Sequence, residues 1–149
     1  MRTAEMLIQA ARDAAASAHA PYSRFGVGAA ILLEDGGIVT GTNFENASYG
    51  LSLCAETVAL ATANSQGKLR QVVEIGVIGG PIGADDALTG ADIVRPCGRC
   101  RQILNEAAQL GGRDILIHCA SGNGEQVETY KLTDLLPHAF GPRDLGIVD

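Results

Sequence analysis

The chain has 149 residues, of which 46% are hydrophobic and 19% are charged, and its formal net charge is -6. This composition excludes a disordered chain, because disorder accompanies low hydrophobicity and high charge, and the length fits a single domain over residues 1–149. The acidic excess argues against a protein that tracks nucleic-acid phosphates, which requires clustered Lys and Arg. We therefore expect a small, weakly charged ligand and no nucleic-acid partner.

The N-terminal segment MRTAEMLIQAARDAAASA carries Glu5, Arg12 and Asp13 among its apolar positions, so it lacks the unbroken apolar core of a secretory signal. No uncharged apolar run in the sequence approaches the roughly 18 residues of a membrane-spanning helix. These features predict a cytoplasmic protein with no membrane partner. Thiols stay reduced in that compartment, so a group of cysteines is expected to hold a metal or do chemistry rather than form disulfides.

The first half of the sequence predicts a helix, a hairpin and a second helix. Apolar residues at three- and four-residue spacing predict an amphipathic helix over 3–18, which Pro21 ends. Small and β-branched residues over 26–33 and 38–44, joined by the turn residues EDGG, predict a β-hairpin. After the ENASYG loop, the alanine-rich stretch 55–63 predicts a helix that ends near Gly67.

The second half predicts a buried strand over 72–80, an irregular loop over 81–95 and a helix over 97–110. Strands over 114–120 and 126–132 follow, joined by the turn SGNGE, and a short helix capped by Thr133 begins at LTDLLP. This alternation predicts an α/β fold with a mixed sheet and helices on both faces. Short apolar runs leave the strand order open.

Cys97 and Cys100 form a C-x-x-C pair that places two thiols on one side of the first turn of a helix, close enough to share an ion. Two small side chains packed in a core would leave the same pattern, and for an isolated pair the two interpretations are equally good. Cys54 also begins a helix after a loop, so two helix N-termini can converge where exposed N–H groups favour thiolates. Three thiolates leave the open fourth position that is typical of a catalytic zinc.

Glu56 lies two residues after Cys54, within reach of that open position without being a ligand. Zinc lowers the pKa of bound water from about 16 to about 7 in favourable sites, and a neighbouring carboxylate can pass the released proton to a leaving group. A Glu in a first helical turn is also common as a partner of the helix dipole alone. Beside the three cysteines, the catalytic interpretation is the stronger one.

The motif C-A-E at 54–56 followed by P-C-x-x-C at 96–100 resembles the zinc-dependent cytidine deaminase superfamily. The similarity runs through PYSRFGVGAA (21–30), NFENASYG (43–50), PCGRCRQ (96–102) and LLPHAFGPRDL (135–145), and the all-cysteine ligand set looks like the small homotetrameric cytidine deaminases. The resemblance implies a three-layer α-β-α sandwich with a mixed five-stranded sheet. It also implies hydrolytic deamination of cytidine and 2'-deoxycytidine in pyrimidine salvage.

Carried over position by position, the resemblance implies that Cys54, Cys97 and Cys100 bind one Zn2+ per subunit. Hydroxide would attack C4 of cytosine, and Glu56 would protonate N3 and then the departing amino group. Ala55 would offer its backbone N–H to the pyrimidine O2.

The resemblance also assigns the nucleoside contacts. Asn43 and Glu45 resemble the pair that holds the ribose 3'-hydroxyl, a role that suits an amide and a carboxylate, although Asn is also frequent in loops. Phe25 lies where the family has an aromatic against the pyrimidine. Phe140 resembles a ring that reaches over a neighbouring subunit's site, and Tyr49 is expected to meet an adjacent subunit's ligand. A homotetramer with shared sites follows from this resemblance.

Many of the small deaminases have an Arg after the catalytic Glu, where this chain has Thr57. Three thiolates and Zn2+ sum to a charge of about -1, which opposes the loss of a proton from the bound water. We therefore expect another donor to compensate, and we hypothesise that Arg101 donates a hydrogen bond to a thiolate because it adjoins Cys100.

Cys119 and His118 adjoin each other in a predicted strand, where alternation places their side chains on opposite faces, so at most one can point toward a metal. We expect Cys119 to be a small buried core residue. Two alternatives to the cytidine deaminase stay open: a deaminase of another aminopyrimidine compound, and a non-catalytic binding module in which four protein ligands saturate a structural zinc.

Overall fold

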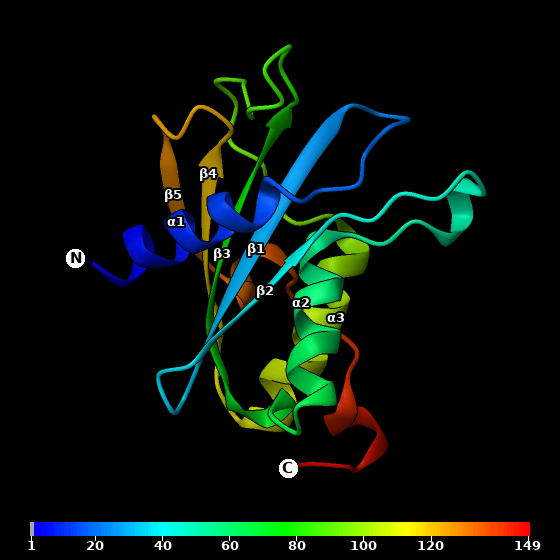
Figure 1. Cartoon of the computed structure of the whole chain (residues 1–149). Helices are drawn as coiled ribbons and strands as arrows, with labels where there is room; N and C mark the ends of the chain where they lie inside the picture. Colours follow the sequence, from blue (N-terminus) through cyan, green and yellow to red (C-terminus); the bar gives the residue numbers. More distant parts are fainter. Residues whose placement is uncertain (1) are drawn as a thin grey trace.

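The computed structural model describes residues 2–149 and shows a three-layer sandwich around one mixed sheet (Figure 1). The sheet has five strands in the order β2-β1-β3-β4-β5. They are β1 (Phe25–Leu33), β2 (Ile38–Thr42), β3 (Val72–Pro81), β4 (Leu116–Ser121) and β5 (Val127–Lys131). Only the pair of β3 and β4 is parallel in this sheet, and the crossover that a parallel pair requires contains helix α3 (Gly98–Gly111). The predicted three-layer α/β fold is confirmed.

Helices cover both faces of the sheet, and each face has its own apolar cluster. Helix α1 (Thr3–Ala15) packs on one face through Leu7, Ile8 and Ala11. Helix α2 (Ala55–Ser65), α3 and the short α4 (Leu132–Leu135) pack on the other face (Figure 1). Among residues 2–149, no helix combines the length and the apolarity needed to cross a bilayer. Because α2 and α3 share one face of the sheet, their N-termini can build a common site.

Two glycines let helices lie directly on the backbone of the sheet. A Cβ atom at Gly28 of β1 would lie 1.9 Å from the carbonyl oxygen of Ala11 in α1. A Cβ atom at Gly41 of β2 would lie 2.5 Å from the backbone nitrogen of Ala59 and 2.6 Å from the carbonyl oxygen of Ala55, both in α2. Real side chains do not tolerate such distances, so the depth at which α2 packs is fixed by the missing side chain of Gly41.

Two predicted elements, the first helix and the second strand, end earlier than the sequence indicates. Helix α1 ends at Ala15 rather than at residue 18. Just beyond it, His19 donates its N–H to the Asn43 carbonyl and accepts from the Glu45 N–H. Strand β2 ends at Thr42 rather than at residue 44. The Asn43 N–H still donates to the Val27 carbonyl of β1, but the Asn43 side chain, rather than its carbonyl, accepts from the Val27 N–H. This irregular junction brings residues 19–25 next to residues 43–45.

In the C-terminal half, the N-cap of the short helix α4 differs from the prediction. The N-cap residue of α4 is Lys131, so the prediction that Thr133 caps this helix is wrong. Thr133 instead donates through Oγ1 to Oδ2 of Asp114 at 2.6 Å, and its N–H donates to Oδ1 of the same carboxylate. Three short 3-10 helices, which the sequence analysis did not anticipate, cover Tyr49–Leu51, Leu69–Gln71 and Pro142–Leu145.

The close approach of α1 predicts that Gly28→Ala destabilises the protein. Overpacking typically costs about 1–3 kcal/mol, so we expect the free energy of unfolding, measured by urea denaturation, to fall by about 2 kcal/mol or more. Gly50→Ala is the matched control, because nothing lies within 4 Å of a Cβ atom added there, and it should change the free energy by less than about 0.5 kcal/mol. An unchanged urea midpoint for Gly28→Ala would contradict this packing.

Candidate metal centre and active site

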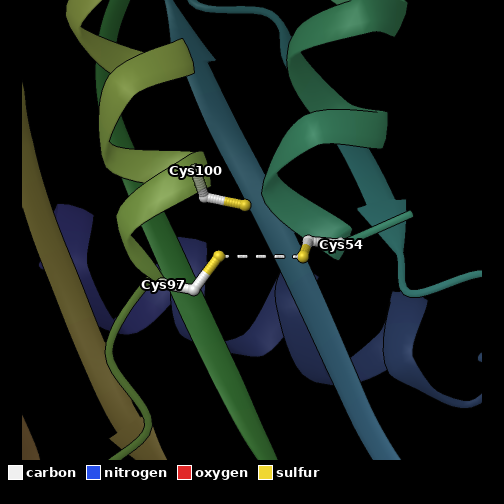
Figure 2. A group of neighbouring side chains, drawn as sticks. All are labelled: Cys54, Cys97 and Cys100. Atoms are coloured by element: carbon white, nitrogen blue, oxygen red, sulfur yellow. Dashed lines mark hydrogen bonds between the residues drawn. The ribbon is translucent and has the colours of Figure 1, made fainter. Parts of the chain in front are cut away.

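Three thiols meet where α2 and α3 begin (Figure 2). Cys54 is the N-cap residue of α2, Cys97 is the N-cap residue of α3, and Cys100 lies in the first turn of α3. Their sulfur atoms all lie within 4.8 Å of one another, and those of Cys54 and Cys97 are 3.9 Å apart. Three sulfurs bound tetrahedrally to zinc at about 2.3 Å would be about 3.8 Å apart. The cluster therefore has the donor type and the spacing of a three-thiolate zinc site.

The surroundings of the three sulfurs differ, and so do their proton affinities. Burial raises the pKa of Cys100 strongly, helped by the nearby Glu56 carboxylate, and burial also raises the pKa of Cys54. At Cys97 burial opposes ionisation too, but hydrogen bonds from the backbone N–H of Cys100, the neighbouring thiols and the N–H of Arg99 lower its pKa overall. A cation bound between the three sulfurs would stabilise their thiolate forms directly.

Glu56 is the buried carboxyl group of this cluster. It is the second residue of α2, and its exposed fraction is only 4%. Burial raises the pKa of its carboxyl group, while its own backbone N–H and the Cys100 thiol partly offset the rise. A carboxyl group with a raised pKa in a cavity is suited to holding and transferring a proton.

A cavity of about 250 Å³ opens beside the cluster. Its lining includes six of the predicted site residues, namely Asn43, Glu45, Ala55 and Glu56 and the thiol-bearing Cys54 and Cys97. The rest of its lining was missed by the sequence analysis: Val27, Ser52, Leu53, Val94 and Arg95. The positions of Ser52 and Arg95, each two residues before a thiol ligand, were the available signal, whereas Val27 comes close only through the sheet.

Asn43 and Glu45 are held in place by the backbone around them. The Asn43 side chain donates through Nδ2 to the Phe25 carbonyl at 2.7 Å and accepts at Oδ1 from the Val27 N–H at 3.0 Å. The Glu45 carboxylate accepts from the Ser23 hydroxyl and from the N–H groups of Ser23 and Tyr22. The Ser23 hydroxyl is the largest cause of the lowered pKa of Glu45. Both polar groups therefore present fixed orientations to the cavity.

The three predicted aromatic contacts lie outside the residues that line the cavity. Phe25 begins β1 on the same strand face as Val27, with 37% of its surface exposed. Tyr49 stacks at a tilt against Tyr22, with ring centroids 5.6 Å apart, and both line a neighbouring hollow of about 290 Å³. Phe140 is 62% exposed, and side chains of α3 hold its backbone carbonyl rather than its ring.

The hydrogen-bond partners of Arg101 are not the thiolate that we hypothesised. Its Nε donates to the Pro96 carbonyl at 2.8 Å, and Nη1 donates to the Leu135 carbonyl at 3.0 Å. The guanidinium therefore ties the segment before Cys97 to the end of α4. Carbonyl oxygens on two different segments accept its hydrogen bonds. The position of Arg101 next to Cys100 in the sequence gives no sign of these partners.

His118 and Cys119 point to opposite faces of β4, as predicted. His118 faces Glu74 and Thr129, with ring nitrogens 3.1 Å from Oε2 and 2.8 Å from Oγ1. Cys119 is fully buried in the apolar cluster beneath α2 and α3, where burial raises the pKa of its thiol to about 12. Within residues 2–149, the candidate metal cluster contains neither of them.

Comparison with known proteins agrees with this geometry. Residues 1–111 match the family model described as the cytidine and deoxycytidylate deaminase zinc-binding region. A cytidine deaminase of Mycobacterium tuberculosis is 45% identical over 94% of this chain and 91% of its own, and one of Halalkalibacterium halodurans is 42% identical over 95% and 97%. The crystal structure of a cytidine deaminase from Burkholderia pseudomallei superposes with a TM-score of 0.79 at 38% identity, covering 94% of this chain and 100% of that one.

Removal of one thiol should abolish tight zinc binding. We expect Cys97→Ala to weaken zinc affinity by more than about 100-fold, since even changes beyond the ligands cost about 10- to 100-fold; competition with a chromogenic chelator measures this. Cys119→Ala is the matched control, because it removes a buried thiol outside the cluster, and it should retain full zinc content. Equal zinc affinity in the two variants would contradict the three-thiol site.

Proposed function

This chain belongs to the family of cytidine and deoxycytidylate deaminases, and on that premise we propose that it deaminates cytidine and 2'-deoxycytidine hydrolytically. The products are uridine and 2'-deoxyuridine with release of ammonia. One observation carries the proposal: the buried Glu56 carboxyl lines one cavity together with Cys54 and Cys97, two members of the three-thiol cluster with zinc spacing.

The three cysteines and Glu56 have different roles in this reaction. Cys54, Cys97 and Cys100 hold the ion, and when bound, zinc supplies Lewis-acid activation of a water molecule. The Glu56 carboxylate accepts a proton from the attacking water and delivers it to N3 of the ring. It then takes the second proton from the hydroxyl group added at C4 and passes it to the departing amino group, which leaves as ammonia. The raised pKa of Glu56 suits this exchange, because the group must take up and release a proton within one turnover.

The nucleoside is oriented by groups on three segments. The N–H of Ala55 is one of the first N–H groups of α2, which have no partner within the helix, and it donates to the pyrimidine O2. Asn43 and Glu45 hold the ribose 3'-hydroxyl, whose donor and acceptor needs an amide and a carboxylate together satisfy. Phe25 does not line the cavity itself but lies on the same face of β1 as the cavity residue Val27, and from there it stacks against the pyrimidine.

The working form is a homotetramer in which neighbouring subunits complete each site. Phe140 reaches over the base in a neighbour's cavity, and Tyr49 contacts the ligand of an adjacent subunit. The exposure of both rings, 62% and 73%, and their position outside their own cavity support this assignment. Isolated protomers would therefore have incomplete pockets.

The reaction belongs to pyrimidine salvage in the cytoplasm. A three-thiolate site requires reduced cysteines, which the cytoplasm maintains, and all four cysteines are free thiols in this structure. A non-catalytic zinc module would use four protein ligands and no adjacent carboxylate, so the cluster of three thiols beside Glu56 favours the enzyme.

Glu56→Gln should separate metal binding from catalysis. We expect this variant to retain zinc, because the three thiols are unchanged, and to lose about 10²- to 10⁴-fold in kcat, the usual contribution of a positioned proton-transfer group. Ammonia release from cytidine measures the rate, with chelator-treated parent protein as the zero-activity reference.

The same assay decides the substrate. Initial rates on cytidine should exceed those on cytosine, adenosine and a cytidine-containing oligonucleotide, and faster turnover of any of these three would replace the proposed substrate class. A parent protein that binds zinc and turns over none of them would support the binding module.

Complementation tests the shared sites. Phe140→Ala should raise KM for cytidine by about 5- to 150-fold, from a stacking contribution of about 1–3 kcal/mol. Tetramers refolded from a mixture of Phe140→Ala and Glu56→Gln chains should regain sites of parental KM, since one chain supplies Glu56 and its neighbour supplies Phe140. The absence of any parental-KM sites, or a fully active monomer by light scattering, would contradict the assignment.

A further inference from the structure

The first turns of α2 and α3 present matching positions to each other. The N-cap residues Cys54 and Cys97 face each other with sulfur atoms 3.9 Å apart. One turn further on, the third helical residues Thr57 and Cys100 face each other, with Oγ1 of Thr57 3.5 Å from Sγ of Cys100. The sequence CAET over 54–57 thus pairs with CGRC over 97–100. Three corners of this arrangement carry sulfur, and the fourth carries a hydroxyl.

Cys100 is the most buried thiol of the cluster. Its sulfur is sealed from solvent, whereas Cys54 is half-buried and Cys97 is exposed, and the Thr57 hydroxyl lies 3.5 Å from the Cys100 sulfur. Cys97 sits at a helix N-cap, where backbone N–H groups already approach its sulfur. Of the two arginines that flank Cys100 in the sequence, Arg101 directs its hydrogen bonds to backbone carbonyls instead.

We infer that Thr57 is a positioning residue of the metal centre, whose hydroxyl donates a hydrogen bond to the Cys100 thiolate. The inference rests on zinc binding by the three cysteines, as in the proposed function. A metal-bound thiolate carries no proton, so in the 3.5 Å contact the hydroxyl is the donor. The bond fixes the direction of the sulfur and withdraws electron density from it, which leaves the bound ion more electrophilic.

Thr57 acts from the side of the cluster away from the substrate. It lies outside the residues that line the cavity and lines instead a shallow hollow along α2 with Val58 and Ala61. The hydroxyl therefore influences the reaction only through Cys100 and touches neither base nor ribose. A neutral donor at this position also leaves the net charge of the site unchanged, whereas a cationic side chain would alter it.

Thr57→Val tests the inference, because it removes the hydroxyl and keeps the shape. We expect zinc affinity to fall about 10-fold, kcat to fall by a similar factor with KM nearly constant, and the thiolate-to-metal charge-transfer band of the Co2+-substituted protein to shift to longer wavelength. Thr57→Ser should restore all three values. Thr57→Ala provides a second hydroxyl-free variant with a smaller side chain, which should show the same spectral shift.

The matched control is Thr62→Val on the same helix. Its hydroxyl donates to the Val58 carbonyl at 2.8 Å, so this variant removes a partly buried helix hydroxyl that has no sulfur neighbour and should behave as the parent. Parental zinc affinity and an unshifted Co2+ band in folded Thr57→Val and Thr57→Ala would overturn the inference while the proposed function stood. A parent protein that binds no zinc would overturn the proposed function itself.

Discussion

Two helices that begin side by side on one face of a sheet create the central constraint of this protein. Their N-termini bring Cys54, Cys97 and Cys100 together with a buried carboxyl at Glu56. Burial and mutual repulsion resist the ionisation of most of these groups. A divalent cation bound by the three sulfurs would stabilise their thiolate forms directly.

Packing against the sheet and neighbouring segments fixes the positions of the two helices that carry the cluster. Gly41 lets α2 approach β2 until backbone meets backbone, which fixes the depth of the helix that carries Cys54 and Glu56. Arg101 ties the segment before α3 to the end of α4 through two carbonyls. Each helix therefore reaches the cluster from a backbone that has little freedom to shift, as a preorganised site requires.

Residues that line the cavity and residues outside it have different roles around the cluster. On the cavity side, Asn43 and Glu45 are already fixed by the backbone of residues 22–27, so a ligand that binds there meets oriented polar groups. Outside the cavity, Thr57 reaches Cys100 from α2. Cys119 fills apolar space in the core without joining the cluster. Tyr49 and Phe140 remain exposed outside the cavity.

The sequence alone determined the helix and strand types, the mixed α/β class and the grouping of three cysteines with one glutamate. These features depend on spacing along the chain: C-x-x-C within a helical turn and a carboxylate two residues after a thiol are local facts that survive in any packing. The family motif then supplied a substrate class that no local spacing contains. Only the tertiary structure decided the strand order, the early ends of α1 and β2, and the partners of Arg101, Thr57 and Asn43. Those choices join atoms that are far apart in sequence, so they are settled by how helices and sheet pack and by which buried donors find the nearest acceptors.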